Sequence, residues 1–311
     1  MSHFTSNMKV SDASTDIDGV NLNATSKYII STSGRIASCE RYKKLISLLK
    51  LNIVYIPTHA MNPNKPLIDP SEYCSALREL PCLGGAISKD IKQSIVPHLD
   101  YIDPTARQYI AINTVIRYQP GETIINTSNI GRRDSKIKDI NEDNNVNNIN
   151  IKIFNDTEQD ILVGYNTDVL GFEYAISNCL RRNTLSLSSA VVYGYGGVTN
   201  VVVGVLKRMG LKVYITGRNP ISITKKAKDL DIAIYTPQVF CDLFVNATPV
   251  TDKPLNLAEN FVETLVSSQC KVIFDHELHG VYLARYCREH FLTHISGMDM
   301  YEPQMVFQWT L

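Results

Sequence analysis

The sequence lacks an excess of charge of either sign, a paired cysteine motif and a long apolar run. Its 31 basic residues equal its 31 acidic residues, so no net field favours binding to nucleic acid or acidic lipid. The seven cysteines are odd in number, scattered and without a Cys-x-x-Cys pair, which indicates a reducing compartment. No run reaches the length of a membrane span, and the N-terminus has no signal-peptide pattern. We therefore expect a cytoplasmic protein without a nucleic-acid or membrane partner.

The order of apolar and polar segments predicts an α/β protein with two domains. A chain of 311 residues is long enough for two cores. Residues 1–26 are polar and without periodicity, which predicts a disordered extension. From residue 27 short β-branched runs alternate with helical patterns, which is typical of a parallel-type sheet. Residues 119–157 end in an asparagine-rich stretch that cannot form a packed core, and we interpret them as an inserted surface loop.

A glycine-rich turn is the strongest local signal in the chain. Residues 190–193 have the pattern of a buried strand, Gly194, Gly196 and Gly197 follow at once, and residues 198–209 have a helical pattern. Glycines between a strand and a helix let the backbone approach a pyrophosphate, which binds the N–H groups of the helix N-terminus. The alternative is an ordinary tight turn. We interpret the segment as a dinucleotide-binding turn.

The end of the next predicted strand indicates which dinucleotide binds. NAD-binding proteins usually place a carboxylate there for the ribose hydroxyl, whereas an arginine suits a 2′-phosphate. The strand at 212–216 is followed by Arg218, and no acidic residue occurs before Asp229. Arg218 therefore favours NADP, although an arginine at the end of a strand is often only solvated.

Four blocks of sequence resemble the shikimate dehydrogenase family, of which this chain looks like a divergent member. The resemblance extends from about residue 28 to residue 309 outside the insertion. The blocks are residues 84–92 (GGAISKDIK), 111–115 (AINTV), 164–172 (GYNTDVLGF) and the glycine turn with Arg218 and residues 246–249 (NATP).

This resemblance implies two α/β domains with a cleft between them, and a role in aromatic amino-acid biosynthesis. Residues 27–118 are expected to form a substrate-binding domain, which the C-terminal helix 297–311 joins. Residues 158–296 are expected to form a Rossmann NADP-binding domain with the linking helix.

The resemblance also implies roles for individual residues. Lys92 and Asp168 match the family's catalytic pair, in which the lysine exchanges a proton with the substrate; a plain salt bridge is the alternative reading. The positions that match substrate ligands are Ser38, Ser88, Asn113 and Gln304. Those that match cofactor ligands are Gly194, Gly196, Gly197, Arg218, Asn246 and Thr248.

Several departures from the family pattern leave the substrate open. Ile36, Ala86 and Leu278 stand where the family has a serine, an amide or hydroxyl, and a tyrosine, and Thr251 replaces a glycine of the cofactor half. We expect NADP-dependent reduction of 3-dehydroshikimate to shikimate, or of a related cyclic hydroxy-acid such as the quinate precursor. The alternative is a non-catalytic sensor or regulator with the same fold.

The remaining pattern is a group of four histidines at positions 276, 279, 290 and 294. They straddle a strand, a loop and a helix, and no cysteine accompanies them. We therefore predict no metal site.

Overall fold

The computed structural model of this chain describes residues 16–17, 20–21, 27–32, 36–48, 50–58, 68–88, 91–122, 124–125, 127, 159–248 and 269–311. They divide into two compact units. The first unit holds the described parts of residues 1–102, 112–124 and 151–165, and the second holds those of residues 103–111, 125–150 and 166–311.

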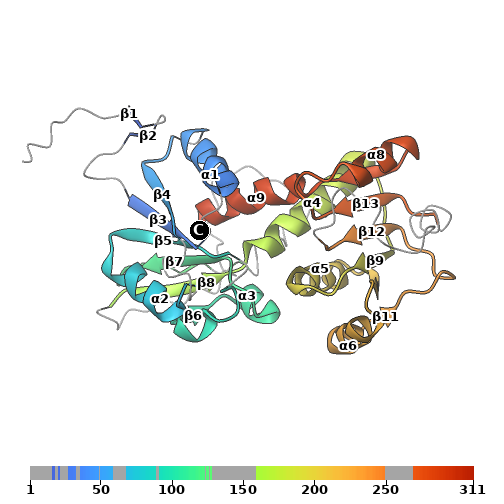
Figure 1. Ribbon diagram of the computed structural model, residues 1–311, viewed down its shortest axis with the longest axis horizontal. Coiled ribbons are helices and arrows are strands. Elements are labelled where there is room, and N and C mark those ends of the chain that lie inside the picture. The colour runs from blue at the N-terminus through green and yellow to red at the C-terminus, as the bar shows by residue number, and fades with distance from the viewer. Residues whose placement is uncertain are drawn as a thin grey trace, which may run out of the picture. The chain divides into compact units, whose positions relative to one another are not determined.

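The first unit is built on a six-stranded mixed sheet in the order β4-β3-β5-β7-β8-β6 (Figure 1). β3 pairs in parallel with β4 and β5, whereas β7 is antiparallel to both of its neighbours, β5 and β8. The predicted α/β class is confirmed, but alternation of strands and helices does not determine strand direction, and β7 departs from a parallel sheet. The strands are β3 Lys27–Ser31, β4 Ile53–Pro57, β5 Cys82–Ala86, β6 Tyr101–Ile102, β7 Thr114–Tyr118 and β8 Ile161–Tyr165.

The helices of the first unit are α1 (Ile36–Leu48), α2 (Pro70–Glu79) and the 3₁₀ turn η1 (Val96–His98). α2 begins at Pro70 because Asp69 accepts hydrogen bonds from the first free N–H groups and a proline fits the first turn of a helix. The hydroxyl of Tyr73 on α2 donates to the carbonyl oxygen of Ile30 at 2.6 Å, which ties this helix to β3.

The second unit has a six-stranded, fully parallel sheet in the order β11-β10-β9-β12-β13-β14. Numbered along the chain, this is the 3-2-1-4-5-6 order of a doubly wound Rossmann sheet. The order reverses between β9 and β12, and such a switch point is where ligands of these sheets bind. The strands are β9 Ser189–Tyr193, β10 Lys212–Thr216, β11 Ala233–Ile234, β12 Leu243–Asn246, β13 Val272–Asp275 and β14 Thr293–Ile295.

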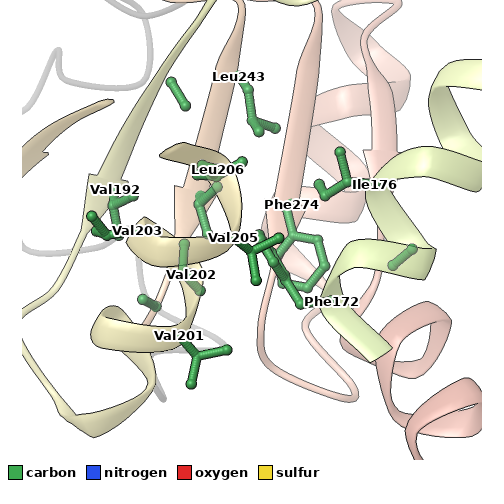
Figure 2. Packing of buried hydrophobic residues seen from close by; sticks show 14 of the residues in the cluster. Phe172, Ile176, Val192, Val201, Val202, Val203, Val205, Leu206, Leu243 and Phe274 are labelled. Atoms are coloured by element: carbon green, nitrogen blue, oxygen red, sulfur yellow. The ribbon is translucent and has the colours of Figure 1, made fainter. Parts of the chain in front are cut away.

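Burial of valine side chains stabilises α5 against its low intrinsic helix propensity. β-branched residues are weak helix formers, yet Val201, Val202, Val203 and Val205 of α5 are all buried. Figure 2 shows them beside Val192 on β9, in a core that also includes phenylalanines of α4 and β13. The helices of this unit are α3 Pro104–Tyr109, α4 Thr167–Asn183, α5 Gly197–Arg208, α6 Pro220–Leu230, α8 Tyr282–Glu289 and α9 Gly297–Thr310.

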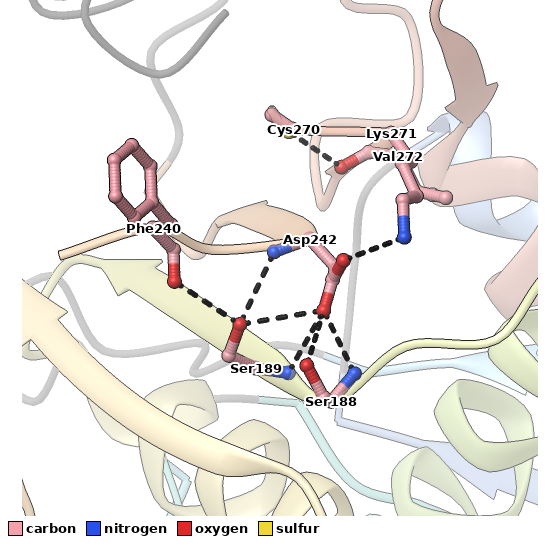
Figure 3. Close-up of polar contacts among 7 residues, drawn as sticks. All are labelled: Ser188, Ser189, Phe240, Asp242, Cys270, Lys271 and Val272. Atoms are coloured by element: carbon pink, nitrogen blue, oxygen red, sulfur yellow. Dashed lines mark hydrogen bonds and ion pairs between the residues drawn. The ribbon is translucent and has the colours of Figure 1, made fainter. Parts of the chain in front are cut away.

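A carboxylate ties together the N-terminal ends of three strands in this sheet. Asp242, just before β12, accepts hydrogen bonds from the backbone N–H groups of Ser188 and Ser189, at 2.8 and 3.2 Å, and from the Ser188 hydroxyl at 2.7 Å (Figure 3). Its other oxygen lies 2.8 Å from the ammonium of Lys271, just before β13. The sequence analysis did not single out this cluster.

The structure bears on three of the segments about which the sequence analysis made predictions. Within residues 1–26, β1 (Asp16–Ile17) and β2 (Val20–Asn21) form an antiparallel pair, and the rest of that segment lies outside the described residues. β8 pairs with β7 and β6 in the first unit's sheet, so residues 159–165 belong to the first unit, and the last segment of the second unit starts at Asn166 and not near residue 158. Most of the predicted 119–157 insertion lies outside the described residues.

None of the helices that the structure describes is both long and apolar enough to span a membrane.

Candidate functional site

The glycine turn lies at the switch point of the second sheet. Gly194 has φ +124°, and a Cβ there would lie 2.9 Å from Thr248 Cγ2 and 3.0 Å from the carbonyl oxygen of Ala247. The backbone N–H of Gly194 also donates to Thr216 at the end of β10. Only glycine fits a positive φ in so narrow a space. The turn after β9 therefore packs closely against residues 247 and 248, which follow β12.

The N-terminus of α5 has the form of a phosphate cradle. Gly196 is its N-cap residue, and no side chain of the described residues caps the free N–H groups there. A Cβ added to Gly196 or to Gly197 would meet no atom of the described part of the chain within 4 Å, so none of those residues fills the space in front of this helix end. Exposed N–H groups and the positive end of the helix dipole suit a pyrophosphate. These residues fit the dinucleotide that the sequence predicts.

A buried polar network orients the segment after β12. The Asn246 amide Nδ2 donates to Asp275 Oδ1 at 2.8 Å, and its Oδ1 accepts from the Thr248 N–H at 3.1 Å and hydroxyl at 2.6 Å. Burial raises the pKa of the Asp275 carboxyl above its usual value. The hydrogen bonds from Asn246 and from the N–H of Glu277 offset only part of this rise. A Cβ on Gly280 would collide with Asp275 Oδ2, so that position admits no side chain without a shift.

Arg218 lies just past the end of β10 with its side chain exposed. Burial raises the pKa of the Tyr193 hydroxyl at the end of β9, and the positive charge of Arg218 partly offsets that rise. No carboxylate occurs between Thr216 and the start of α6. This chemistry suits a 2′-phosphate better than a free ribose hydroxyl.

In the first unit, three predicted residues gather at one edge of the sheet. The N–H of Ile112 donates to the carbonyl of Lys92, the N–H of Ile87 to that of Asn113, and the N–H of Asn113 to that of Tyr165. These bonds hold the backbones of Lys92 and Asn113 at the edge of the sheet where β5 and β8 end and β7 begins. Ser88 lies two residues after the end of β5, at the same edge.

Ser88 also contacts a residue that the sequence analysis missed. Its N–H donates to Thr32 Oγ1 at 2.7 Å, and its hydroxyl lies 3.2 Å from the same atom. Thr32 follows β3 directly and is 8% exposed. A hydroxyl immediately after a predicted parallel strand was the available signal, because the carboxyl ends of such strands share one edge.

In the second unit, Asp168 and Gln304 lie on two helices that pack closely. Asp168 is in the first turn of α4, and its N–H donates to the side-chain oxygen of the N-cap residue Asn166 at 3.1 Å. A Cβ on Gly171, one turn later, would lie 2.8 Å from the Cβ of Gln304 on α9. Asn166 is buried, and its Nδ2 has no partner within the described part of the chain.

The remaining predicted residues are only partly described. Ser38 lies in the first turn of α1, and its side chain, like that of Ile36, is outside the described residues, as is Thr251. Ala86 ends β5 and is buried, and Leu278 lies in the turn after β13. The pairing of Lys92 with Asp168 stays a prediction, because the two residues belong to different units. Within the described residues, no three His, Cys, Asp or Glu side chains form a group that could hold a metal ion.

Comparison with curated proteins finds shikimate dehydrogenases (NADP(+)). The protein of Desulforamulus reducens is 27% identical over 221 residues, which is 66% of this chain and 60% of the relative. That of Aquifex aeolicus is 24% identical over 213 residues, 66% of this chain and 61% of the relative. That of Helicobacter acinonychis is 37% identical over 93 residues, 29% of this chain and 33% of the relative. The matches to the two longer-matching relatives thus span about three fifths of their length, and no family model matches the chain.

Solved structures of the same kind match nearly the whole fold. A shikimate 5-dehydrogenase-like protein has a TM-score of 0.66 at 20% identity, covering 93% of this chain and 91% of its own. Shikimate dehydrogenase from Aquifex aeolicus has a TM-score of 0.65 at 22% identity, covering 93% of both chains. The enzyme from Thermus thermophilus, solved with NADP(H) and shikimate, has a TM-score of 0.62 at 20% identity, covering 91% and 92%. The predicted resemblance is confirmed: the chain is similar to shikimate dehydrogenases in sequence and in fold.

Proposed function

We propose that this chain, a divergent relative of the shikimate dehydrogenases, is an NADP-dependent oxidoreductase that acts on a cyclic hydroxy-acid. The default substrate pair is 3-dehydroshikimate and shikimate, since the curated relatives bear that name. The observation that carries the proposal is the glycine turn at the sheet's switch point, with Gly194 pressed against Thr248 and Arg218 beside it. This is a dinucleotide-binding arrangement in the chemical form that suits NADP.

The cofactor ligands of the proposal all come from the second unit. Gly196, Gly197 and the N-terminus of α5 bind the pyrophosphate, and Arg218 binds the 2′-phosphate. Asn246 and Thr248 shape the segment that faces the glycine turn, because their mutual hydrogen bonds fix its path. NADPH, when bound, supplies the hydride.

Lys92 acts in the proposal as the proton donor and acceptor. Reduction of a ketone needs a proton at the carbonyl oxygen as hydride reaches the carbon. An ammonium group provides that proton and stabilises the negative charge that develops on the oxygen. Asp168 orients the ammonium and accepts a hydrogen bond from a substrate hydroxyl. The further ligands for the substrate's hydroxyl and carboxylate groups are Ser38, Ser88, Asn113 and Gln304.

A non-catalytic sensor or regulator is the second candidate. Ala86 is buried at the end of β5 with no polar side-chain atom, and Leu278 brings an apolar side chain to the turn after β13. Each such change removes a hydrogen bond worth on the order of 1 kcal/mol, so that together they would weaken binding of shikimate unless other groups replace them.

A substrate screen separates the two candidates. Purified protein is incubated with NADP⁺ and, in turn, shikimate, quinate and other cyclic hydroxy-acids, and NADPH is followed by its absorbance. The proposal predicts turnover of at least one of them. Tight binding of a hydroxy-acid without turnover of any would support the sensor. Absence of NADPH binding in fluorescence titrations would contradict the oxidoreductase proposal itself.

A further inference from the structure

Asp275 is a buried carboxylate at the carboxyl end of β13. It is 1% exposed, and within the described residues no cation forms an ion pair with it. Its Oδ1 accepts hydrogen bonds from Asn246 Nδ2 at 2.8 Å and from the backbone N–H of Glu277 at 3.2 Å. Its Oδ2 faces Gly280, where an added Cβ would collide with it. Hydrogen bonds and close packing, and not a counter-charge, therefore fix the orientation of this carboxyl.

The surroundings of Asp275 do not favour a negative charge. Burial raises the pKa of the carboxyl, the nearby Glu277 carboxylate raises it further, and the hydrogen bonds that it accepts offset only part of this rise. A buried carboxylate without a cation reduces stability unless its hydrogen bonds compensate. What this position contributes is therefore an oxygen acceptor rather than a charge.

Asp275 determines which way the amide of Asn246 points. The two residues are paired across β12 and β13, and Asn246 is completely buried. Because its Nδ2 donates to Asp275, its Oδ1 is turned toward Thr248, from which it accepts the N–H at 3.1 Å and the hydroxyl at 2.6 Å. Rotation of the amide by half a turn would set its donor against the Thr248 N–H and its acceptor against the carboxylate. Asp275 thus fixes the hydrogen bonds of Asn246 from a neighbouring strand.

Thr248 transmits this order toward the glycine turn. A Cβ on Gly194 would lie 2.9 Å from Thr248 Cγ2, so the two segments leave little room between them. The contacts run from Asp275 on β13 through Asn246 on β12 to the turn after β9, across the point where the strand order reverses.

Each half of a doubly wound sheet receives one nucleotide of a dinucleotide. β9, β10 and β11, with the glycine turn and Arg218, form the half that suits the adenosine nucleotide. β12, β13 and β14 form the other half, which is left for the nicotinamide nucleotide. The N–H of Gly194 donates to the Thr216 carbonyl on β10, so the first half also has a support that does not depend on Asp275.

We propose that Asp275 is a positioning residue for the nicotinamide nucleotide: through Asn246 it orients residues 246–248, against which that half of the cofactor binds. This inference rests on the proposed function and adds a residue that itself touches neither cofactor nor substrate. Loss of the acceptor frees the Asn246 amide to turn and the segment to shift. Binding of the nicotinamide nucleotide is then weakened, whereas the adenosine nucleotide keeps its ligands at the glycine turn and Arg218.

Binding of two ligands to the full chain tests this. NADPH contains both nucleotides, whereas 2′,5′-ADP contains only the adenosine half. Fluorescence titration of NADPH and calorimetry of 2′,5′-ADP compare the wild type with Asp275→Ala. The variant is expected to bind NADPH about tenfold more weakly, as loss of a buried hydrogen bond predicts, and 2′,5′-ADP within about twofold of wild type. The matched control is Glu289→Ala, an exposed carboxylate on α8, which should change neither affinity by more than about twofold.

Asp275→Asn separates the acceptor from the charge. Its amide oxygen can accept the same two hydrogen bonds, so an NADPH affinity within about threefold of wild type is expected. Its melting temperature should equal or exceed that of wild type, because a buried charge without a cation is removed. Thermal unfolding checks the fold of every variant. Asp275→Leu, which fills the space without an acceptor, replaces Asp275→Ala if the latter does not fold, with the same expected result.

The outcomes separate this inference from the function on which it rests. Unchanged NADPH binding by Asp275→Ala, with a wild type that binds it, would overturn the role of Asp275 and leave the NADP proposal standing. An equal loss for NADPH and 2′,5′-ADP would also overturn it, since the residue would then support the unit as a whole. A tenfold loss of NADPH affinity in Asp275→Asn would contradict the role of the oxygen acceptor. A wild type that binds neither ligand would contradict both proposals.

Discussion

At the scale of single residues, Asp242 connects the N-terminal ends of three strands of the Rossmann sheet through hydrogen bonds and an ion pair. One carboxylate oxygen accepts from Ser188 and Ser189, and the other pairs with Lys271 (Figure 3). Partial burial raises the pKa of this carboxyl, but the hydrogen bonds from Lys271 and Ser188 outweigh it and hold the pKa well below its usual range. The ionised carboxylate is therefore the form that holds β9, β12 and β13 in register.

We predict that Asp242→Asn destabilises the protein by about 2 kcal/mol at neutral pH, because it removes the charge and half of the acceptor capacity. A carboxyl whose pKa is lower in the folded state stabilises the protein above its unfolded pKa, near 4, and loses this contribution as pH falls toward the folded pKa. Urea unfolding of both proteins between pH 7 and pH 3 measures the difference, which should shrink below about pH 4.

The control for that series is Asp229→Asn, which changes an exposed aspartate on α6. Its free energy of unfolding should stay within about 0.5 kcal/mol of the wild type at each pH. A constant penalty for Asp242→Asn over the whole pH range would show that packing of the side chain, and not its charge, holds the strands.

At the scale of elements, the packing of α4 against α9 sets the positions of Asp168 and Gln304. Gly171 of α4 has no side chain, and a Cβ there would lie 2.6 Å from the carbonyl oxygen of Met300 and 2.8 Å from Gln304 Cβ on α9. The first of these atoms belongs to the backbone and cannot move aside alone. The two helices can approach this closely only with a glycine at this position.

We predict that Gly171→Ala forces α9 away from α4 and destabilises the protein by about 1–3 kcal/mol, although alanine is the better helix former. Thermal or urea unfolding measures the change. Ser177→Ala, on the exposed side of the same helix, is the matched control and should be neutral or slightly stabilising. A Gly171→Ala variant as stable as the control would mean that α9 adjusts to the added methyl group without cost.

The elements that could be predicted from the sequence are those marked by a local pattern, such as glycines between a strand and a helix. The glycine turn and the strands at residues 190–193 and 212–216 are where the patterns indicated. β6 and β8 escaped detection because a two-residue strand has no periodicity and β8 adjoins the asparagine-rich segment. The direction of β7 depends on pairing with strands distant in sequence, which local patterns do not contain. The contacts of Asp242 and Thr32 likewise join residues far apart in the chain.

At the scale of the whole molecule, the proposed cofactor ligands and the proposed proton donor belong to different units. The glycine turn, Arg218, Asn246 and Thr248 belong to the second unit, and Lys92 belongs to the first. The proposal therefore predicts that a single mutation can abolish turnover without affecting cofactor binding. A change at Lys92 should abolish turnover and leave cofactor binding intact, because no cofactor ligand of the proposal comes from the first unit.

The most direct test of the central claim is the kcat/KM of wild type and Lys92→Ala for NADP⁺ reduction with the hydroxy-acid that the wild type oxidises fastest. Gln93→Ala, an exposed neighbour, is the control, and NADPH affinity is measured for all three proteins. We predict a loss of at least about a hundredfold for Lys92→Ala, the usual contribution of a general acid or base, with NADPH affinity within about twofold of wild type. A Lys92→Ala protein that turns over at the wild-type rate would contradict the assignment of Lys92 as the proton donor.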